Sequence, residues 1–201
     1  MGGLPEPLQD LVERLGELPG FGPKSALRAA LALLRMPRER AEALGGSILD
    51  LRRKLTFCSC CRALAACDPC PICADPDRED EVICLVGDLD SLISMEEGGF
   101  FHGRYHVLGG LLAPLDGVDA SQLEIEPLRA RLAKGLVREL VLAFGATLEA
   151  EATASHVKNL VAREFPEVAV SRLAQGIPLG AEVKHMDHET LRQSLVHRQK
   201  L

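Results

Sequence analysis

The sequence predicts an α/β protein of several parts: an N-terminal helical hairpin, a four-cysteine knuckle, a parallel α/β domain and a C-terminal helical tail. Three observations predict this class. A Pro- and Gly-rich turn separates two helical stretches, two C-x-x-C pairs follow, and the remaining chain alternates strand-like with helix-like segments. These changes in pattern place the expected boundaries at 1–56, 57–74, 75–175 and 176–201.

Composition limits the classes to which the chain can belong. Of its 201 residues 47% are hydrophobic, which is enough to build a core. No apolar stretch reaches the roughly 20 residues that span a bilayer, and the N-terminus carries no apolar signal segment. We therefore expect a cytoplasmic protein without a membrane partner. With no Trp and one Tyr, the chain has too few aromatic residues for base stacking to be its main binding mode.

The segment 18–26, LPGFGPKSA, predicts a helix-hairpin-helix. Gly20 and Gly22 permit positive φ in a tight turn, and Pro23 suits the first turn of the next helix. Free N–H groups at that helix start, with Lys24 beside them, suit a phosphate oxygen. Such contacts do not read bases, so the expected ligand is DNA without sequence specificity. An ordinary corner between two helices would show the same turn, and that alternative stays open.

Basic residues gather near this hairpin although the net charge is −6. Residues 20–41 contain five Lys or Arg against Glu39 alone, and Lys24 and Arg28 lie four residues apart on one helix face. A small basic face predicts weak, salt-sensitive phosphate binding per subunit, which oligomerisation would strengthen. Solvation without a partner is the simpler interpretation of the other three basic residues, Arg35, Arg38 and Arg40.

Two C-x-x-C pairs separated by eight residues, Cys58/Cys61 and Cys70/Cys73, suit one tetrahedral zinc ion. Each pair places two thiolates on one tight turn, and two facing turns complete a closed shell. Four thiolates leave no open coordination position, so the expected cofactor is a structural Zn²⁺ rather than a catalytic one.

The other three cysteines leave the ligand set open. Cys67-x-x-Cys70 also has ligand spacing, and Cys60 lies inside the cluster, whereas Cys84 in an apolar run is typical of a buried small hydrophobe. Disulfides are disfavoured, because seven cysteines is an odd number and the chain carries no secretory mark.

Short apolar runs rich in branched residues predict four strands: 82–86, 105–108, 140–144 and 168–170. Amphipathic stretches between them predict helices at 126–133 and 152–161. This alternation is typical of a parallel sheet with both faces covered.

Acidic pairs follow two of these strands. Asp88 and Asp90 come after the first, and Glu149 and Glu151 after the third. Carboxylates beyond the C-terminal end of a strand can share a divalent cation, as in Toprim nucleotidyl-transfer sites. Strand-to-helix loops are also routinely acidic because anions favour helix N-termini, and the pattern alone favours this second interpretation.

Two strings are highly specific, YHVLGG at 105–110 and PLDG at 114–117, and three more accompany them: EAEATA at 149–154, GIPLG at 176–180 and DHETL at 187–191. With the hairpin and the knuckle they resemble the RecR family of bacterial recombination mediators over nearly the whole chain, 8–198. The resemblance implies a Toprim-like domain, basic DNA contacts at the hairpin, and these four zinc ligands: Cys58, Cys61, Cys70 and Cys73.

The resemblance also implies a role. The family member is a non-catalytic DNA-binding mediator of DNA repair and recombination. It forms a ring-like homotetramer through both terminal regions, so 176–201 would be an oligomerisation segment. As a clamp it works with RecO, and in some settings RecF, to load the recombinase onto single-stranded DNA.

Three positions depart from the family pattern. Gly87 replaces the usual Glu after the first Toprim strand, Glu149-Ala150-Glu151 replaces Glu-Gly-Glu or Glu-Gly-Asp, and 184–185 is Lys-His rather than acidic and aromatic. A Toprim-type metal-dependent nuclease or nucleotidyl-transfer enzyme, the alternative function, needs that first carboxylate as a general acid or base. We therefore expect no catalytic residue, and a partner-facing or weakly metal-binding acidic patch at Glu149 and Glu151.

Overall fold

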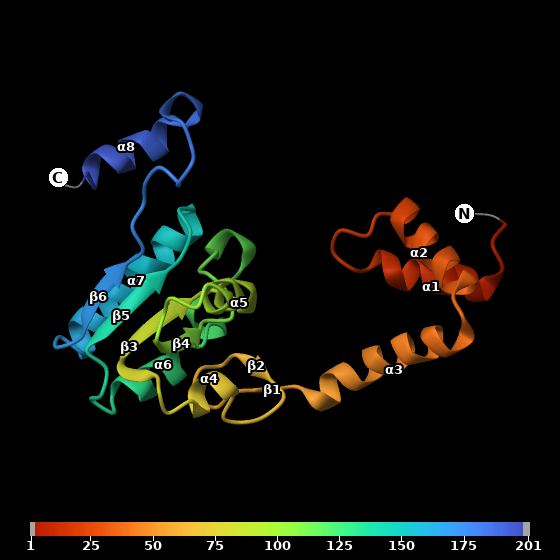
Figure 1. Ribbon diagram of the computed structural model, residues 1–201, viewed down its shortest axis with the longest axis horizontal. Coiled ribbons are helices and arrows are strands. Elements are labelled where there is room, and N and C mark those ends of the chain that lie inside the picture. The colour runs from red at the N-terminus through yellow and green to blue at the C-terminus, as the bar shows by residue number, and fades with distance from the viewer. Residues whose placement is uncertain (1–2, 199–201) are drawn as a thin grey trace. The chain divides into compact units, whose positions relative to one another are not determined.

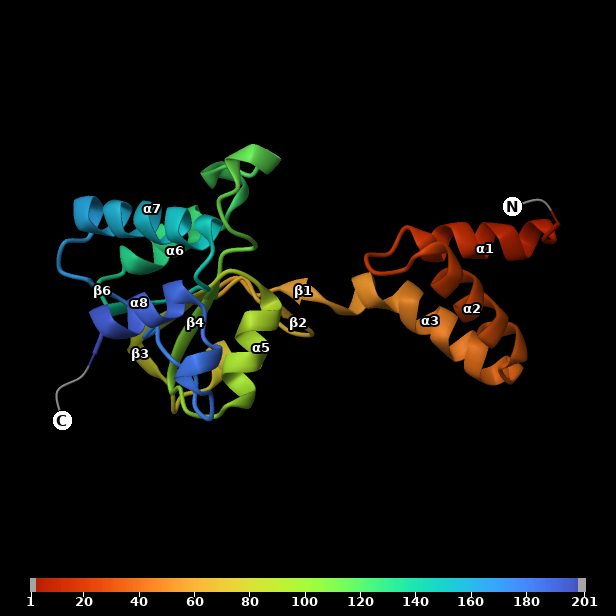
Figure 2. The same cartoon turned by 90° about the horizontal axis from the view of Figure 1, so that it is seen from above.

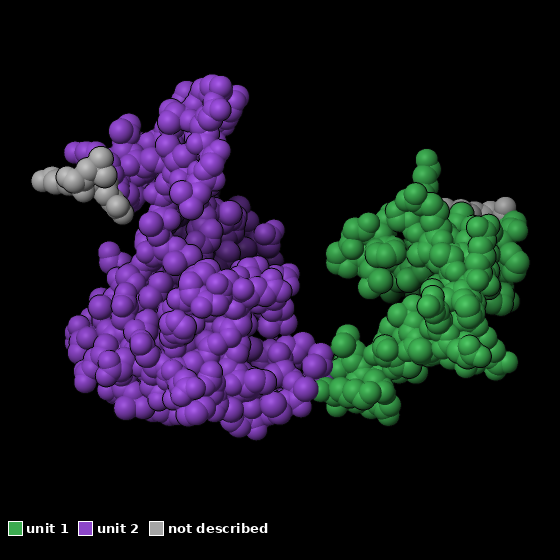
Figure 3. Space-filling model, viewed as in Figure 1, with its two compact units in different colours: residues 1–54 green, residues 55–201 purple. Residues whose placement is uncertain are grey.

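The computed structural model describes residues 3–198 and divides into two compact units, residues 1–54 and 55–201 (Figure 3). The ends of the predicted segments 1–56 and 176–201, at residues 1–2 and 199–201, lie outside the described residues. Within the described chain, none of the helices is both long and apolar enough to cross a membrane.

The first unit consists of three helices: α1 (Glu6–Gly16), α2 (Pro23–Arg35) and α3 (Arg38–Lys54) (Figure 1). Val12 from α1 packs against Ala26 and Ala30 from α2, and leucines of both helices surround them. Small residues on α2 let the two helices approach closely. The third helix buries no residue among those described, so its apolar side chains are left at the surface.

The turn between α1 and α2 uses its glycines differently from the prediction. Gly20 has φ +81, in the left-handed region that favours glycine. Gly22 has φ −75 and ψ 167, so the expectation of positive φ there was wrong. It is the N-cap of α2, and its carbonyl accepts the N–H groups of Ser25 and Ala26 at 2.9 and 3.0 Å. Pro23 occupies the first turn of α2, as predicted.

The second unit is built on a four-stranded parallel sheet of order β4-β3-β5-β6. Its strands are β3 (Glu79–Val86), β4 (Gly103–Val107), β5 (Glu139–Ala143) and β6 (Ala169–Arg172). Each coincides with one of the predicted apolar runs to within a few residues, and the predicted parallel α/β class is confirmed.

The two faces of the sheet carry different layers, because successive side chains of a strand point to opposite sides. Ile83 and Leu85 belong to a core with α6 (Ile125–Leu132) and α7 (Leu148–Glu164). Cys84 and Val86 join a second core with α5 (Leu89–Glu97) and the cysteine knuckle. Figure 2 shows α6 and α7 on one side of the strands and α5 on the other.

Short elements complete this unit. The knuckle contains β1 (Thr56–Phe57), β2 (Leu64–Ala65) and α4 (Pro71–Ala74). Beyond it lie η1 (Pro114–Asp116), η2 (Ala120–Gln122), η3 (Val183–His185) and α8 (His188–Val196). Lys184 and His185, which depart from the family pattern, lie in η3, where Lys184 pairs with Glu182 at 2.5 Å.

Candidate zinc site and nucleic-acid interface

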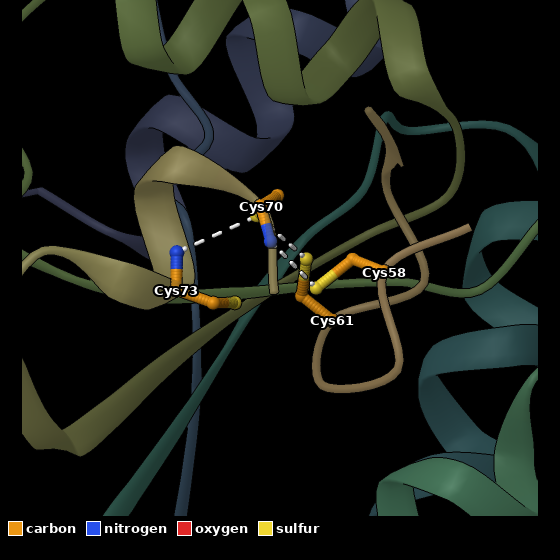
Figure 4. Close-up of side chains that lie close together, drawn as sticks. All are labelled: Cys58, Cys61, Cys70 and Cys73. Atoms are coloured by element: carbon orange, nitrogen blue, oxygen red, sulfur yellow. Dashed lines mark hydrogen bonds between the residues drawn. The ribbon is translucent and has the colours of Figure 1, made fainter. Parts of the chain in front are cut away.

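Four cysteines meet in the knuckle (Figure 4). Cys58 and Cys61 lie on the turn between β1 and β2, while Cys70 is the N-cap of α4 and Cys73 lies within that helix. Their sulfur atoms all lie within 4.8 Å of one another. The first three cysteines are buried and Cys73 is partly buried, so the cluster forms a closed site of the kind that structural zinc occupies.

Backbone N–H groups point at these sulfurs. Cys70 N–H donates to the sulfur of Cys58 at 3.3 Å, and Cys73 N–H donates to that of Cys70 at 3.4 Å. A hydrogen bond from Cys73, helped by bonds from Ala63, Cys70 and Cys58, lowers the pKa of Cys61 to about 5 against the opposing effect of burial. The hydrogen bond between Cys73 and Cys61 raises the pKa of Cys73. Burial raises the pKa of Cys70 to about 11.

Mutual repulsion adds to the raised pKa values of Cys70 and Cys73, because four sulfurs this close cannot all ionise beside one another in a low dielectric. A bound dication removes the restriction by neutralising the thiolates, and four soft, largely buried thiolate donors suit the closed tetrahedral shell of structural Zn²⁺. The residues therefore fit the metal.

The remaining cysteines stand apart from this cluster. Cys60 and Cys67 are exposed, and Cys84 is fully buried in β3, where burial raises the pKa of its thiol to about 11. Within residues 3–198, no second group of three or more Cys, His, Asp or Glu gathers closely enough to hold a metal.

The knuckle is attached to the sheet by backbone and side-chain bonds. Val107 N–H in β4 donates to the carbonyl of Cys61 at 2.8 Å. Next to it, Arg62 adopts φ +64, and its guanidinium reaches the carboxylate of Glu124 at 2.9 Å. Tyr105 and Val107 share a core with the buried cysteines, so the metal region and β4 support each other.

The carboxyl end of β3 lacks the carboxylate of a nucleotidyl-transfer site and leaves little space for one. Gly87 is buried, and a Cβ at this position would lie 3.2 Å from Cδ2 of Leu111, so any side chain there requires Leu111 to move. Asp88 accepts a hydrogen bond from the N–H of Ser91 at 2.7 Å and caps α5, with Asp90 in the first turn. These carboxylates serve the helix start, which the sequence pattern favoured.

Glu149 and Glu151 both lie in the first turn of α7, but their surroundings differ. Hydrogen bonding to its own backbone N–H and to Thr147 lowers the pKa of the exposed Glu149. Arg172 holds both carboxylate oxygens of Glu151, at 2.6 and 3.2 Å, and lowers its pKa. One of the two carboxylates of the predicted acidic patch is therefore already paired with a guanidinium.

The hairpin presents its predicted DNA-binding residues at the surface. Lys24 and Arg28 are both exposed on α2, one turn apart, and no side chain caps the N-terminus of this helix. For Lys24, the structure of residues 3–198 contains no bond from its backbone N–H. Ser25 and Ala26 bond to Gly22, so fewer N–H groups are free than the sequence suggested.

Sequence reasoning missed one feature of this unit. Arg35 and Arg40, interpreted as solvated and unpartnered, line a cavity of about 560 Å³ together with Arg28. The density of basic residues along 24–40 was a signal, but only the corner between α2 and α3 brings Arg28, Arg35 and Arg40 together.

Three family models match the chain in series. They are the RecR helix-hairpin-helix over residues 8–51, the RecR zinc finger domain of the four-cysteine type over 55–75 and the Toprim domain over 81–174. The chain is 56% identical to Recombination protein RecR of Nitratidesulfovibrio vulgaris and 55% to that of Maridesulfovibrio salexigens, in both cases over the full length of both chains. It is 42% identical to the protein of that name from Acidothermus cellulolyticus, over 96% of each chain. With helix-hairpin-helix, four-cysteine zinc finger and Toprim sheet in this order, and with relatives that match from end to end, the chain belongs to the RecR family of recombination proteins.

Proposed function

We propose that this protein is a non-catalytic mediator of DNA repair and recombination that binds DNA without sequence specificity. The observation that carries the proposal is the hairpin. No side chain caps the start of α2, and two exposed cations, Lys24 and Arg28, lie one turn apart on one face of this helix. Such a surface suits phosphate oxygens and contacts no base edges. We assign Gly20 to the turn, Gly22 to the helix start, and 1–56 to DNA binding.

The proposed mechanism is a ring-like clamp of four subunits in the cytoplasm, working with RecO and in some settings RecF. It helps to load the recombinase onto single-stranded DNA. The direct test measures recombinase filament formation on a single strand coated by single-strand-binding protein, with RecO present. Filaments should form faster with this protein than without it, and an equal rate would refute the loading role.

In the knuckle, we propose Cys58, Cys61, Cys70 and Cys73 as the ligands of a structural Zn²⁺. The distance limit of 4.8 Å among their sulfurs and the exposure of Cys60 and Cys67 support this set. The metal has no catalytic role in the proposal, because four protein ligands leave no position for a substrate or water.

Assembly through the terminal regions is supported by apolar side chains on α3. Leu44, Ile48 and Leu51 are 43%, 67% and 59% exposed. At spacings of four and three residues they fall within about 60° of one another around the helix. A continuous apolar stripe on a helix with no buried residue is the kind of surface that a second copy of the chain covers.

Placing charge on this stripe should lower the number of subunits. We expect the Leu44→Lys, Ile48→Lys double variant to lose at least half of the parent's mass in native mass spectrometry, because lysines cannot be buried unpaired at an apolar contact. Leu49→Lys is the matched control, since Leu49 is 75% exposed on the same helix but points about 100° away from Ile48. A parent-like mass for the double variant would rule out this face as an interface.

The protein should also fail to cleave or join DNA with Mg²⁺ or Mn²⁺. Gly87 supplies no carboxylate, its position packs against Leu111, and Asp88 is engaged in capping α5. The measurement incubates labelled single- and double-stranded DNA with each metal and analyses the products on denaturing gels. Turnover that disappears in Glu149→Gln would show that the Toprim edge is catalytic after all.

A further inference from the structure

A hollow lined by arginines lies at the corner where α2 gives way to α3. Arg28 and Arg35 reach it from α2 and Arg40 from α3, and the volume is about 560 Å³. The remaining lining residues are apolar or backbone-restricting: Leu31, Ala32, Met36 and Pro37. We call this hollow the arginine groove. It lies entirely within the first compact unit.

The arginine groove continues the basic face of the hairpin. Along α2, Lys24, Arg28 and Arg35 fall within about 40° of one another and extend over about 16 Å of helix axis. Arg28 therefore belongs both to the hairpin surface and to the groove. After Pro37 the chain turns, and Arg40 joins the same hollow from the next helix.

Charge in the groove is uncompensated within the part of the chain that is described. No acidic residue lines it, and neither Arg35 nor Arg40 forms an ion pair there. Among residues 3–198, the guanidinium of Arg28 donates a side-chain hydrogen bond only to the hydroxyl of Ser25, at 3.4 Å. By contrast, two other exposed arginines of this unit are neutralised, Arg38 by Glu42 and Arg53 by Asp50. The groove thus differs from an ordinary solvated helix surface, on which arginines commonly pair with nearby carboxylates.

We propose that the nucleic-acid backbone runs from the hairpin into the arginine groove, where Arg35 and Arg40 bind further phosphates. This inference rests on the proposed DNA binding and adds a second contact region to it. Guanidinium groups match phosphate oxygens in charge and geometry, and no acidic residue among those that line the groove competes for them. A backbone is favoured over an isolated anion because the cations extend beyond the groove to Lys24, over about 16 Å of helix axis.

The test counts phosphate contacts through the salt dependence of binding. The probe is a fluorescently labelled, mixed-sequence single-stranded oligonucleotide, titrated with the full-length parent and with Arg35→Gln, Arg40→Gln. Each lost contact should lower the slope of log affinity against log salt by about 0.7, and two contacts by about 1.4. Raising the salt from about 50 to 200 mM weakens the binding of both proteins. The factor by which the parent's affinity falls should be roughly 7 times larger than the factor for the double variant.

The matched control is Arg38→Gln, Arg53→Gln, which removes the same charge from arginines that are already paired. Its slope should stay at the parent value. Equal slopes for the two double variants, or no change in Arg35→Gln, Arg40→Gln, would overturn the groove contact. A change of subunit number only in the groove variant would overturn it as well, because the groove would then be an interface. If the parent itself fails to bind the oligonucleotide, the proposed function falls along with this inference.

Discussion

Replacing Lys24 and Arg28 by glutamate is expected to reduce DNA binding by at least about 100-fold at low salt. The double variant changes four charge units per subunit, removes two phosphate contacts and adds repulsion at an uncapped helix start. In a multi-subunit clamp the loss multiplies, because every subunit is affected. The measurement is fluorescence anisotropy with single-stranded and duplex oligonucleotides of several sequences, and the loss should depend little on sequence.

A charge-matched control separates contact from general electrostatics. Arg14→Glu with Arg38→Glu changes the same four charge units in the same compact unit, but Arg14 is paired with Asp10 and Arg38 with Glu42. All four side chains at the test and control positions are exposed, so folding and zinc content should be preserved. The hairpin hypothesis fails if the folded Lys24→Glu, Arg28→Glu protein, with parent-like subunit number, binds DNA as tightly as the parent.

Loss of one zinc ligand should have the largest effect on structure. Cys58→Ser or Cys73→Ser is expected to abolish zinc stoichiometry and to unfold residues 57–74. Zinc-binding free energies on the order of 10 kcal/mol exceed what so short a segment gains from its own core. Cys58 is fully buried in the core shared with β4, so the loss should extend to that strand. Metal analysis gives the stoichiometry, and hydrogen exchange reports protection of the knuckle and of β4.

Cys60→Ser is the matched control, because its side chain is exposed and outside the cluster. This variant should retain one zinc per chain and parent-like exchange protection. Zinc loss in Cys60→Ser would mean that the ligand set includes this residue.

Sequence patterns predicted the sheet well, since strands covered on both faces are continuous apolar runs. The runs around Ile83, Tyr105 and Leu140 became β3, β4 and β5. The nine-residue helix α5 was not predicted. It buries only Leu92, so its sequence shows little amphipathic periodicity, although Asp88 and Asp90 favoured a helix start at this point. Gly22 shows a similar limit, because a glycine tolerates positive φ without requiring it.

The candidate sites, too, could be predicted from the sequence only in part. Spacing predicted the zinc knuckle, because two short C-x-x-C turns constrain their thiolates locally. It could not decide between Cys67 and Cys73, which both stand three residues from Cys70; in the structure Cys73 lies in the sulfur cluster, whereas Cys67 is exposed outside it. The arginine groove escaped prediction because Arg35 and Arg40 belong to different helices, and their proximity depends on the extended backbone of Met36 before Pro37.

The attachment of the knuckle to the sheet bears on how this family can diverge. Cys61 bonds through its carbonyl to Val107, Arg62 bonds to Glu124, and Tyr105 packs with the buried cysteines. Exchanging the knuckle alone between family members would therefore disrupt these contacts with the rest of the domain. A knuckle transplanted from a distant relative should need matching residues at 105, 107 and 124 to be inherited with it. We expect substitutions in these two stretches of the gene, far apart in the chain, to arise as compensated pairs.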